Sequence, residues 1–281
     1  MRDLNKMLRD LISFAEENEN IRAMVLQGSF VNDSSRKDIF SDLDPRFYVN
    51  DVTEFTENDE WKNEFGSVIS WFNDGWIEED NLKSYTRLVL YEDGFKIDFS
   101  FTPIELAKYA NNMQLYKVIV DKDGVIPKPE VDDERKFYVK KPAERDFIKI
   151  IDEFFWDTSY IVKSLYRDEV FFTKFMFNIL QEKIEDLLMW HIGVKNNFKV
   201  NTGLTGRYFK KYLTDKEWEM LLRTYSASNK EDNIKALYAS CELVRYLGVF
   251  IASELGYKYP HKHDKDMTEY INRSVENYLK E

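Results

Sequence analysis

Two aspartates separated by a single residue, Asp42 and Asp44, are the side chains in this sequence best suited to chemistry. In a β-strand the side chains at positions i and i+2 lie on one face, so both carboxylates would point to the same region of space. Such a pair favours Mg²⁺, which prefers oxygen ligands and is commonly held by one or two carboxylates together with substrate phosphates. The spacing therefore indicates metal-assisted phosphoryl or nucleotidyl transfer.

Two further features support this chemistry. Gly28-Ser29 ends the short apolar segment 23–27, where backbone N–H groups and a hydroxyl can approach a triphosphate. Asp98 lies in segment 96–101, whose apolar residues alternate with polar ones, and this alternation puts Asp98 on the polar face of a strand. A third carboxylate on a neighbouring strand can accept the proton of an attacking hydroxyl or bind a second metal ion, and the sequence does not choose between these roles.

The elements that must position these residues are indicated by hydrophobic periodicity. Apolar residues at helical spacing predict an opening helix from Leu4 that ends near residues 16–20. Strands are predicted at residues 23–27, 47–49, 87–91 and 96–101, with a turn at Glu92-Asp93-Gly94 between the last two. Pro and Gly between residues 121 and 142 predict a linker, and the segments 145–165, 171–191, 215–225 and 233–255 predict a helical bundle.

Composition restricts the partners. The net charge of −11 opposes binding to a nucleic-acid backbone and favours a cationic small molecule. We find no targeting segment and no apolar run long enough to cross a membrane, which predicts a cytoplasmic protein without a membrane partner. The one cysteine, Cys241, lies in an apolar stretch and is predicted to be a buried, inert thiol. The oligomeric state is not indicated.

The sequence also resembles a known family, the aminoglycoside 6-adenylyltransferases, within the polymerase-β-like nucleotidyltransferase superfamily. The similar residues in the first half are Asn20-Ile21-Arg22, Gly28-Ser29, Asn32, Asp38, Phe40, Asp42, Asp44, Tyr48-Val49, Asn58-Asp59, Trp61, Phe65-Gly66, Leu90, Glu92-Asp93-Gly94 and Asp98. Those in the second half are Lys141-Pro142, Glu153-Phe154, Lys216-Glu217-Trp218-Glu219, Thr224-Tyr225-Ser226 and Tyr257-Lys258-Tyr259-Pro260.

The resemblance implies an α/β (α+β) nucleotidyltransferase domain with a mixed sheet over residues 1–135 and a helical-bundle domain over residues 136–281. It implies transfer of AMP from ATP to a hydroxyl of an aminoglycoside such as streptomycin, with Mg²⁺ as cofactor. Carried over to this sequence, Asp42, Asp44 and Asp98 bind metal, Gly28 and Ser29 contact phosphate, and Asp98 is the candidate base. Two alternatives stay open: a different acceptor, or a catalytically weakened homologue that only binds nucleotide.

Three residues depart from the family pattern close to the expected site. Phe30 replaces the usual Arg after Gly-Ser, Pro45 replaces an aliphatic residue, and Arg46 replaces a small or apolar one. Pro45 predicts an irregular or edge strand because proline cannot donate a ladder hydrogen bond. Arg46 then has two equally supported interpretations: a guanidinium that competes with metal for Asp42 and Asp44, or a side chain turned into solvent by a bulge.

Other polar and aromatic residues are expected to have structural roles. His191 is expected to be packed or hydrogen-bonded, and His261 and His263 to belong to a solvated tail. Glu182, Glu185 and Asp186 fit a solvated helix face as well as a surface for a cationic drug. Aromatic residues at 154–156 and 171–172 are expected in the bundle core.

Overall fold

The computed structural model describes residues 4–32, 35, 37–38, 40–112, 115–129 and 134–279. The chain forms two compact units, Met1–Lys136 and Phe137–Glu281, which are described separately. The first is built on a six-stranded sheet and the second is helical, so the predicted fold class is confirmed.

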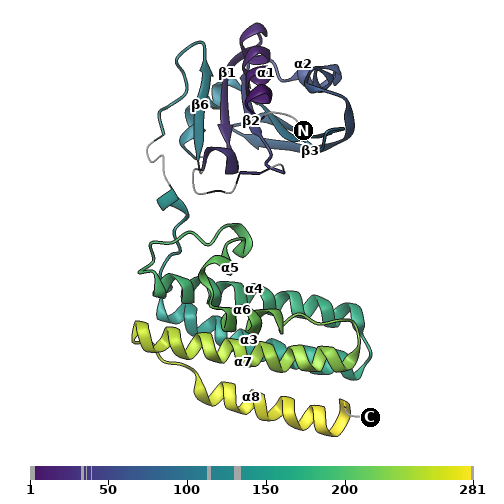
Figure 1. The fold of residues 1–281 in the computed structure, drawn as a ribbon, viewed down its shortest axis with the longest axis vertical. Coiled ribbons are helices and arrows are strands. Elements are labelled where there is room, and N and C mark those ends of the chain that lie inside the picture. Colours follow the sequence, from purple (N-terminus) through teal and green to yellow (C-terminus); the bar gives the residue numbers. More distant parts are fainter. Residues whose placement is uncertain are drawn as a thin grey trace. The chain divides into compact units, whose positions relative to one another are not determined.

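The first unit contains one mixed sheet, with strand order β3-β4-β5-β2-β1-β6 (Figure 1). The strands are β1 (Ile21–Gln27), β2 (Asp44–Val49), β3 (Val68–Glu79), β4 (Leu82–Tyr91), β5 (Lys96–Pro103) and β6 (Tyr116–Asp121). The pair β2–β5 is parallel and the other pairs are antiparallel. The remaining elements are α1 (Leu4–Glu17), α2 (Thr53–Thr56), η1 (Gly28–Val31), η2 (Glu60–Phe65), η3 (Ile104–Asn112) and η4 (Glu134–Phe137).

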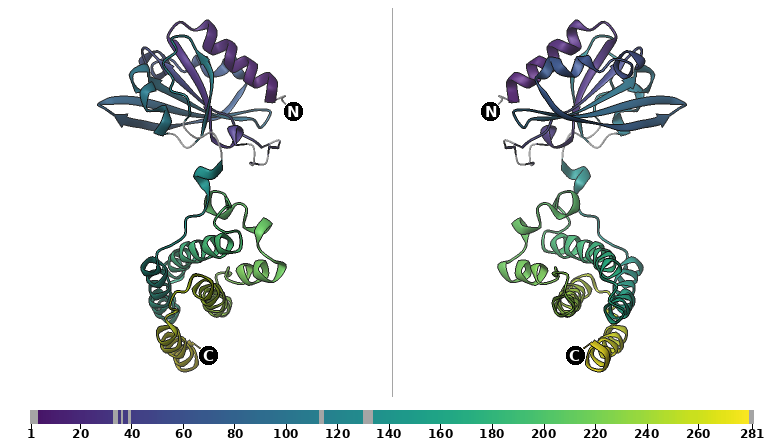
Figure 2. Two further views of the ribbon diagram at one scale, coloured as in Figure 1. Left: turned by 90° about the vertical axis from the view of Figure 1, so that its left-hand side faces the viewer. Right: turned by 90° about the vertical axis from the view of Figure 1, so that its right-hand side faces the viewer.

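The two faces of this sheet differ in chemistry. One face carries the main core of the unit, in which Phe47, Phe99 and Phe101 pack with Phe14 of α1 and Trp61 of η2. Figure 2 shows α1 crossing this face. On the opposite face a smaller cluster lies under η3, with Val25, Tyr48, Ala107 and Tyr116 among its members. Because side chains alternate along a strand, the polar residues of β5 lie on this second face.

The second unit is a bundle with a single hydrophobic core cluster. Its α-helices are α3 (Glu144–Tyr166), α4 (Val170–Lys195), α5 (Phe209–Tyr212), α6 (Asp215–Leu222), α7 (Lys230–Leu255) and α8 (His261–Ser274). It also has a short 3-10 helix, η5 (Leu204–Gly206), and a π-helix, η6 (Val275–Leu279). Figure 2 shows several of them nearly end-on. By length and composition α7 is a membrane-span candidate among the described residues, but 61% of its apolar window is buried, as in the core helix of a bundle.

Several expectations for the helical unit are confirmed and two are wrong. Cys241 is buried, and the buried His191 lies 2.7 Å from Glu217 Oε1 through Nε2. His261 and His263 belong to α8 and not to a solvated tail, and His263 Nδ1 lies 2.7 Å from Asp152 Oδ1. Of the aromatic residues expected in the core, Phe154 and Phe155 are buried, but Trp156, Phe171 and Phe172 are exposed, so the expectation is wrong for these three.

Candidate active site

The Gly-Ser segment lies directly beside the first carboxylate. Strand β1 ends at Gln27, which pairs with Asp44, and the chain then enters η1 at Gly28. Gly28 has φ +75°, and a Cβ at this position would lie 2.3 Å from Asp44 Oδ2. Both the backbone conformation and the close approach therefore require glycine. Gly28 and Ser29 are exposed, so a ligand can reach them.

A short parallel pairing brings the other two carboxylates to the same place. Leu43 N donates to Lys96 O at 3.3 Å, and Asp98 N donates to Leu43 O at 2.9 Å. The register of β2 and β5 continues unchanged beyond this bridge, from Leu43 opposite Ile97 to Arg46 opposite Ser100. Asp44 is therefore the lateral neighbour of Asp98, and Asp42 is the lateral neighbour of Lys96, on the second face of the sheet.

The carboxylates of Asp42, Asp44 and Asp98 lie close enough together for their negative charges to repel one another. Burial, followed by the charges of Asp98 and Asp42, raises the pKa of Asp44 to about 6. Asp98 Oδ1 is buried and has no hydrogen-bond partner among the described residues. A divalent cation would satisfy this orphaned acceptor and relieve the repulsion, so the donor set fits a hard metal ion.

A lysine that the sequence analysis missed is part of this cluster. Lys96 Nζ lies 2.9 Å from Asp98 Oδ2 and 3.6 Å from Asp42 Oδ2. The available signal was its position two residues before Asp98 on the polar face of the same strand. Within the described ranges no group of three or more His, Cys, Asp or Glu side chains could hold a metal ion as they stand. A metal ion such as Mg²⁺ would then need substrate phosphates as ligands besides one or two of these carboxylates.

Neither interpretation of Arg46 holds. Strand β2 is interior, and Pro45 pairs with Leu26 in an unbroken register, so the prediction of an edge or a bulge is wrong. Arg46 Nη1 donates to Thr102 Oγ1 at 3.1 Å, and burial lowers the pKa of the guanidinium. Arg46 lies on the second face of the sheet, two residues after Asp44 in β2. Its guanidinium donates to Thr102 there and is neither paired with the carboxylates of the site nor turned outward by a bulge.

Pro45 has no backbone N–H group, and its effect on the sheet is limited to one hydrogen bond. The parallel ladder places N–H donors from β2 to β5 at every second residue, so after Leu43 the next donor would be residue 45. A proline there leaves out this single bond, and the named strand pairing resumes at Arg46. Register is kept because the antiparallel pairing with β1 continues through Pro45.

The Phe30 departure changes the surroundings of the Gly-Ser segment. The ring of Phe30 packs partly buried against the main core, and Lys37 Nζ lies 5.1 Å from the ring centroid. The ammonium of Lys37 thus places a cation near Phe30, where the resemblance implies an arginine.

In the segment that precedes Asp42, Asp38 Oδ1 accepts a hydrogen bond from Phe40 N at 2.9 Å.

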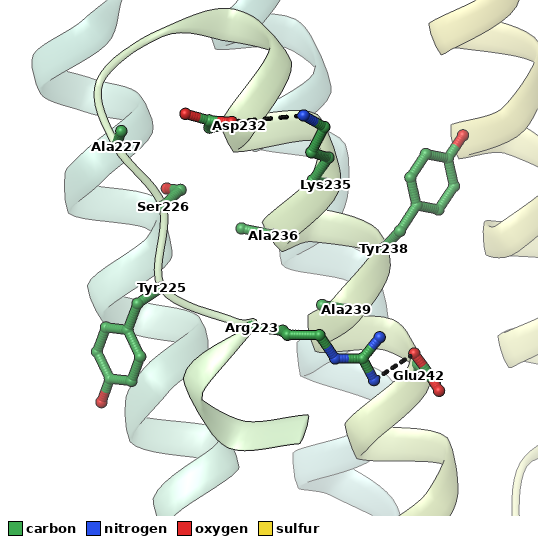
Figure 3. Close-up of a pocket in the computed structure, with 10 residues that line it drawn as sticks. All are labelled: Arg223, Tyr225, Ser226, Ala227, Asp232, Lys235, Ala236, Tyr238, Ala239 and Glu242. Atoms are coloured by element: carbon green, nitrogen blue, oxygen red, sulfur yellow. Dashed lines mark hydrogen bonds and ion pairs between the residues drawn. The ribbon is translucent and has the colours of Figure 1, made fainter. Parts of the chain in front are cut away.

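The helical unit contains a separate cavity of about 560 Å³ beside α7 (Figure 3). It is lined by Arg223, Tyr225, Ser226, Ala227, Asp232, Lys235, Ala236, Tyr238, Ala239 and Glu242. Figure 3 shows that its charged side chains pair with one another: Arg223 Nη2 lies 3.0 Å from Glu242 Oε2, and Lys235 Nζ lies 3.6 Å from Asp232 Oδ1. None of the predicted site residues lines it.

Two other polar groups of the helical unit were singled out from the sequence. Burial and neighbouring carboxylates raise the pKa of both Glu185 and Asp186, which lie with Glu182 on α4. Glu217, in contrast, has a structural role: against the effect of burial, hydrogen bonds from Thr214 and His191 lower its pKa to about 2. Its carboxylate also completes a capping box with Thr214 at the start of α6.

Comparison with known proteins identifies the family to which this chain belongs. Residues 1–274 match the family described as streptomycin adenylyltransferase. The aminoglycoside 6-adenylyltransferase of Bacillus subtilis (strain 168) is 34% identical over 276 residues, covering 96% of this chain and 97% of that protein. The aminoglycoside 6-adenylyltransferase of Staphylococcus aureus is 30% identical, covering 99% of this chain and all of that protein (100%).

A crystal structure of an aminoglycoside 6-adenyltransferase from Bacillus subtilis is 30% identical, covers 98% of this chain and 99% of that chain, and has a TM-score of 0.48. On the family match and the curated relatives, the chain belongs to the streptomycin adenylyltransferase family. It is therefore an enzyme of the nucleotidyltransferase class.

Proposed function

We propose that this protein transfers AMP from ATP to a hydroxyl of an aminoglycoside such as streptomycin, with Mg²⁺, and so inactivates the antibiotic. The observation that carries the proposal is the meeting of Asp42, Asp44 and Asp98 beside Gly28. The family match and the names of the relatives support the acceptor class. The net charge of −11 suits a cationic acceptor.

In this reaction the acceptor oxygen forms a bond to the α-phosphorus of ATP, and the bond to the leaving pyrophosphate breaks. Asp42, Asp44 or Asp98 would hold Mg²⁺ together with the phosphates, and the bound ion would supply neutralisation of phosphate charge and alignment of the attack. Gly28 and Ser29 offer backbone N–H groups and a hydroxyl to the phosphates. Asp98 receives the proton of the acceptor hydroxyl or helps to bind metal.

Incubation with labelled ATP, Mg²⁺ and a panel of aminoglycosides tests the proposal. The expected product is one adenylylated aminoglycoside with release of pyrophosphate. If no member of the panel is labelled where an established family member works, the acceptor assignment is wrong. Release of pyrophosphate with another hydroxyl compound would then support a different acceptor.

A second candidate function, nucleotide binding with weak transfer, is favoured by one observation. Phe30 packs partly buried against the main core, at the position where the resemblance implies an arginine, and so offers no charge there. ATP binding without turnover on any acceptor would support this candidate.

A first prediction concerns the close approach at Gly28. Gly28→Ala should weaken Mg–ATP binding and lower transfer, because the added methyl group strains the backbone at φ +75° and displaces Asp44 Oδ2. Calorimetric titration of Mg–ATP measures the effect. Gly94→Ala is the matched control, since Gly94 has φ +83° with nothing within 4 Å of its Cβ position. Equal affinities in the two variants would contradict a role for the contact with Asp44.

A second prediction follows from the charge of Asp44. Its pKa is raised to about 6, and a metal ion binds the deprotonated carboxylate, so protons compete with the metal below that pH. The dissociation constant for Mn²⁺, used as a probe for Mg²⁺, should be constant above about pH 7 and rise up to about tenfold per unit below about pH 6. Calorimetry in a pH series measures it, and equal dissociation constants at about pH 5 and pH 8 would refute the assignment of Asp44 as a ligand.

A further inference from the structure

We infer that Lys96 is the built-in counter-cation of the carboxylate site: it holds Asp98 and Asp42 in place without metal and gives up these ion pairs when a divalent cation binds. The inference rests on the proposed function. It assigns a positioning residue to this site.

The position of Lys96 is fixed by its backbone as well as by its side chain. Lys96 O accepts the hydrogen bond from Leu43 N, so the residue belongs to the same ladder that aligns the carboxylates. On the other side its neighbour in β4 is Leu90, an apolar residue that offers the ammonium no acceptor. The ammonium therefore points along the second face, to Asp98 at 2.9 Å and Asp42 at 3.6 Å.

Charge balance gives Lys96 its role. Burial and then the charges of Asp98 and Asp42 hinder the ionisation of Asp44, and the charge of Lys96 opposes this effect. A metal ligated by Asp98 or Asp42 must share or replace the contacts of the ammonium with the same oxygens. The ammonium and the metal ion repel each other at such distances. Stronger ion pairs between Lys96 and the carboxylates therefore mean a lower affinity of the carboxylates for the metal.

Removal of the lysine charge tests the inference directly. Mn²⁺ is titrated calorimetrically into wild type, Lys96→Gln and Lys96→Arg at about pH 8, which is above the pKa of Asp44. Lys96→Gln should bind Mn²⁺ roughly 2- to 10-fold more tightly, a modest effect because the Lys96 side chain is 37% exposed. Lys96→Arg keeps the charge and should stay within about twofold of wild type. Lys83→Gln, which removes an exposed lysine of β4, is the matched control and should not change the affinity.

Thermal unfolding gives a second readout that does not depend on turnover. Without metal, Lys96→Gln should unfold at a lower temperature than wild type and Lys83→Gln, because the carboxylates lose their counter-charge. Saturating Mn²⁺ should remove the difference.

The outcomes separate the inference from the proposed function. If wild type binds Mn²⁺ and folded Lys96→Gln binds it equally or more weakly, the inference is wrong and the proposed metal site stands. If wild type does not bind Mn²⁺, with or without ATP, both fail. If Lys96→Gln does not fold even with Mn²⁺, Lys96 is a structural residue and the inference is also overturned.

Discussion

Asp44→Asn is expected to abolish adenylyl transfer while the protein stays folded. Asparagine keeps the size of the side chain but removes an anionic ligand from the point where η1 approaches the carboxylates. Labelled-AMP transfer to an aminoglycoside measures the loss. Asp42→Asn should have the same direction of effect, whereas Asp74→Asn, an exposed carboxylate on β3, should transfer as wild type does.

Asp44→Asn, although expected to be inactive, should not lose stability. The folded state raises the pKa of Asp44 from 3.8 to about 6, so it holds a proton that the unfolded chain has already released in this interval. Stability of the metal-free wild type therefore falls as pH rises from about 4 to about 6, and Asp44→Asn lacks this loss. The variant should match or exceed the unfolding temperature of wild type at about pH 7 and above. An inactive variant that is also less stable there would indicate a structural role for Asp44.

Asp98→Asn is expected to lower the rate of the chemical step by about 10²–10⁴-fold if Asp98 is the general base. Its Oδ2 accepts from Lys96, whereas the buried Oδ1 has no partner among the described residues, so one oxygen is available to substrate or metal. Single-turnover rates, with Mn²⁺ and ATP dissociation constants measured in parallel, separate the two roles. A base affects the rate alone, and a metal ligand affects Mn²⁺ binding as well. An unchanged rate would leave Asp98 as a structural strand residue.

Much of the site could be predicted because it depends on local patterns. The alternation of Ile97, Phe99 and Phe101 with Lys96 and Asp98 assigned the polar face of β5, and the structure confirms it. Gly28-Ser29 at a strand end and Asp42 two residues before Asp44 needed only the geometry of a strand. The role of these residues in transfer remains a proposal.

The features that the sequence did not reveal depend on partners distant in the chain. Strand β3 lies at the sheet edge and exposes Trp71, Phe72, Trp76 and Ile77, so its apolar residues show no simple alternation. Pro45 predicted an edge strand because the local sequence does not show that pairing with β1 preserves the register.

Helix α8 has a polar sequence, and its place in the unit depends on a distant partner. Arg245 of α7 binds the buried Asp264 of α8, with Nε 2.7 Å from Oδ2. The contact of Lys96 with Asp42 has the same non-local character, because it requires the pairing of two segments far apart in the chain. Such contacts follow from topology and cannot be read from periodicity.

The two faces of the sheet have different roles, and this difference affects how the enzyme can evolve. Along β5, Ile97, Phe99 and Phe101 face the aromatic core, and Lys96 and Asp98 face the carboxylate cluster. Substitutions on the core face thus act mainly on the amount of folded protein. Substitutions on the polar face act on the reaction and, through the charges gathered there, on stability as well. A change in the reaction can therefore begin on the polar face while the packing of the aromatic core stays intact.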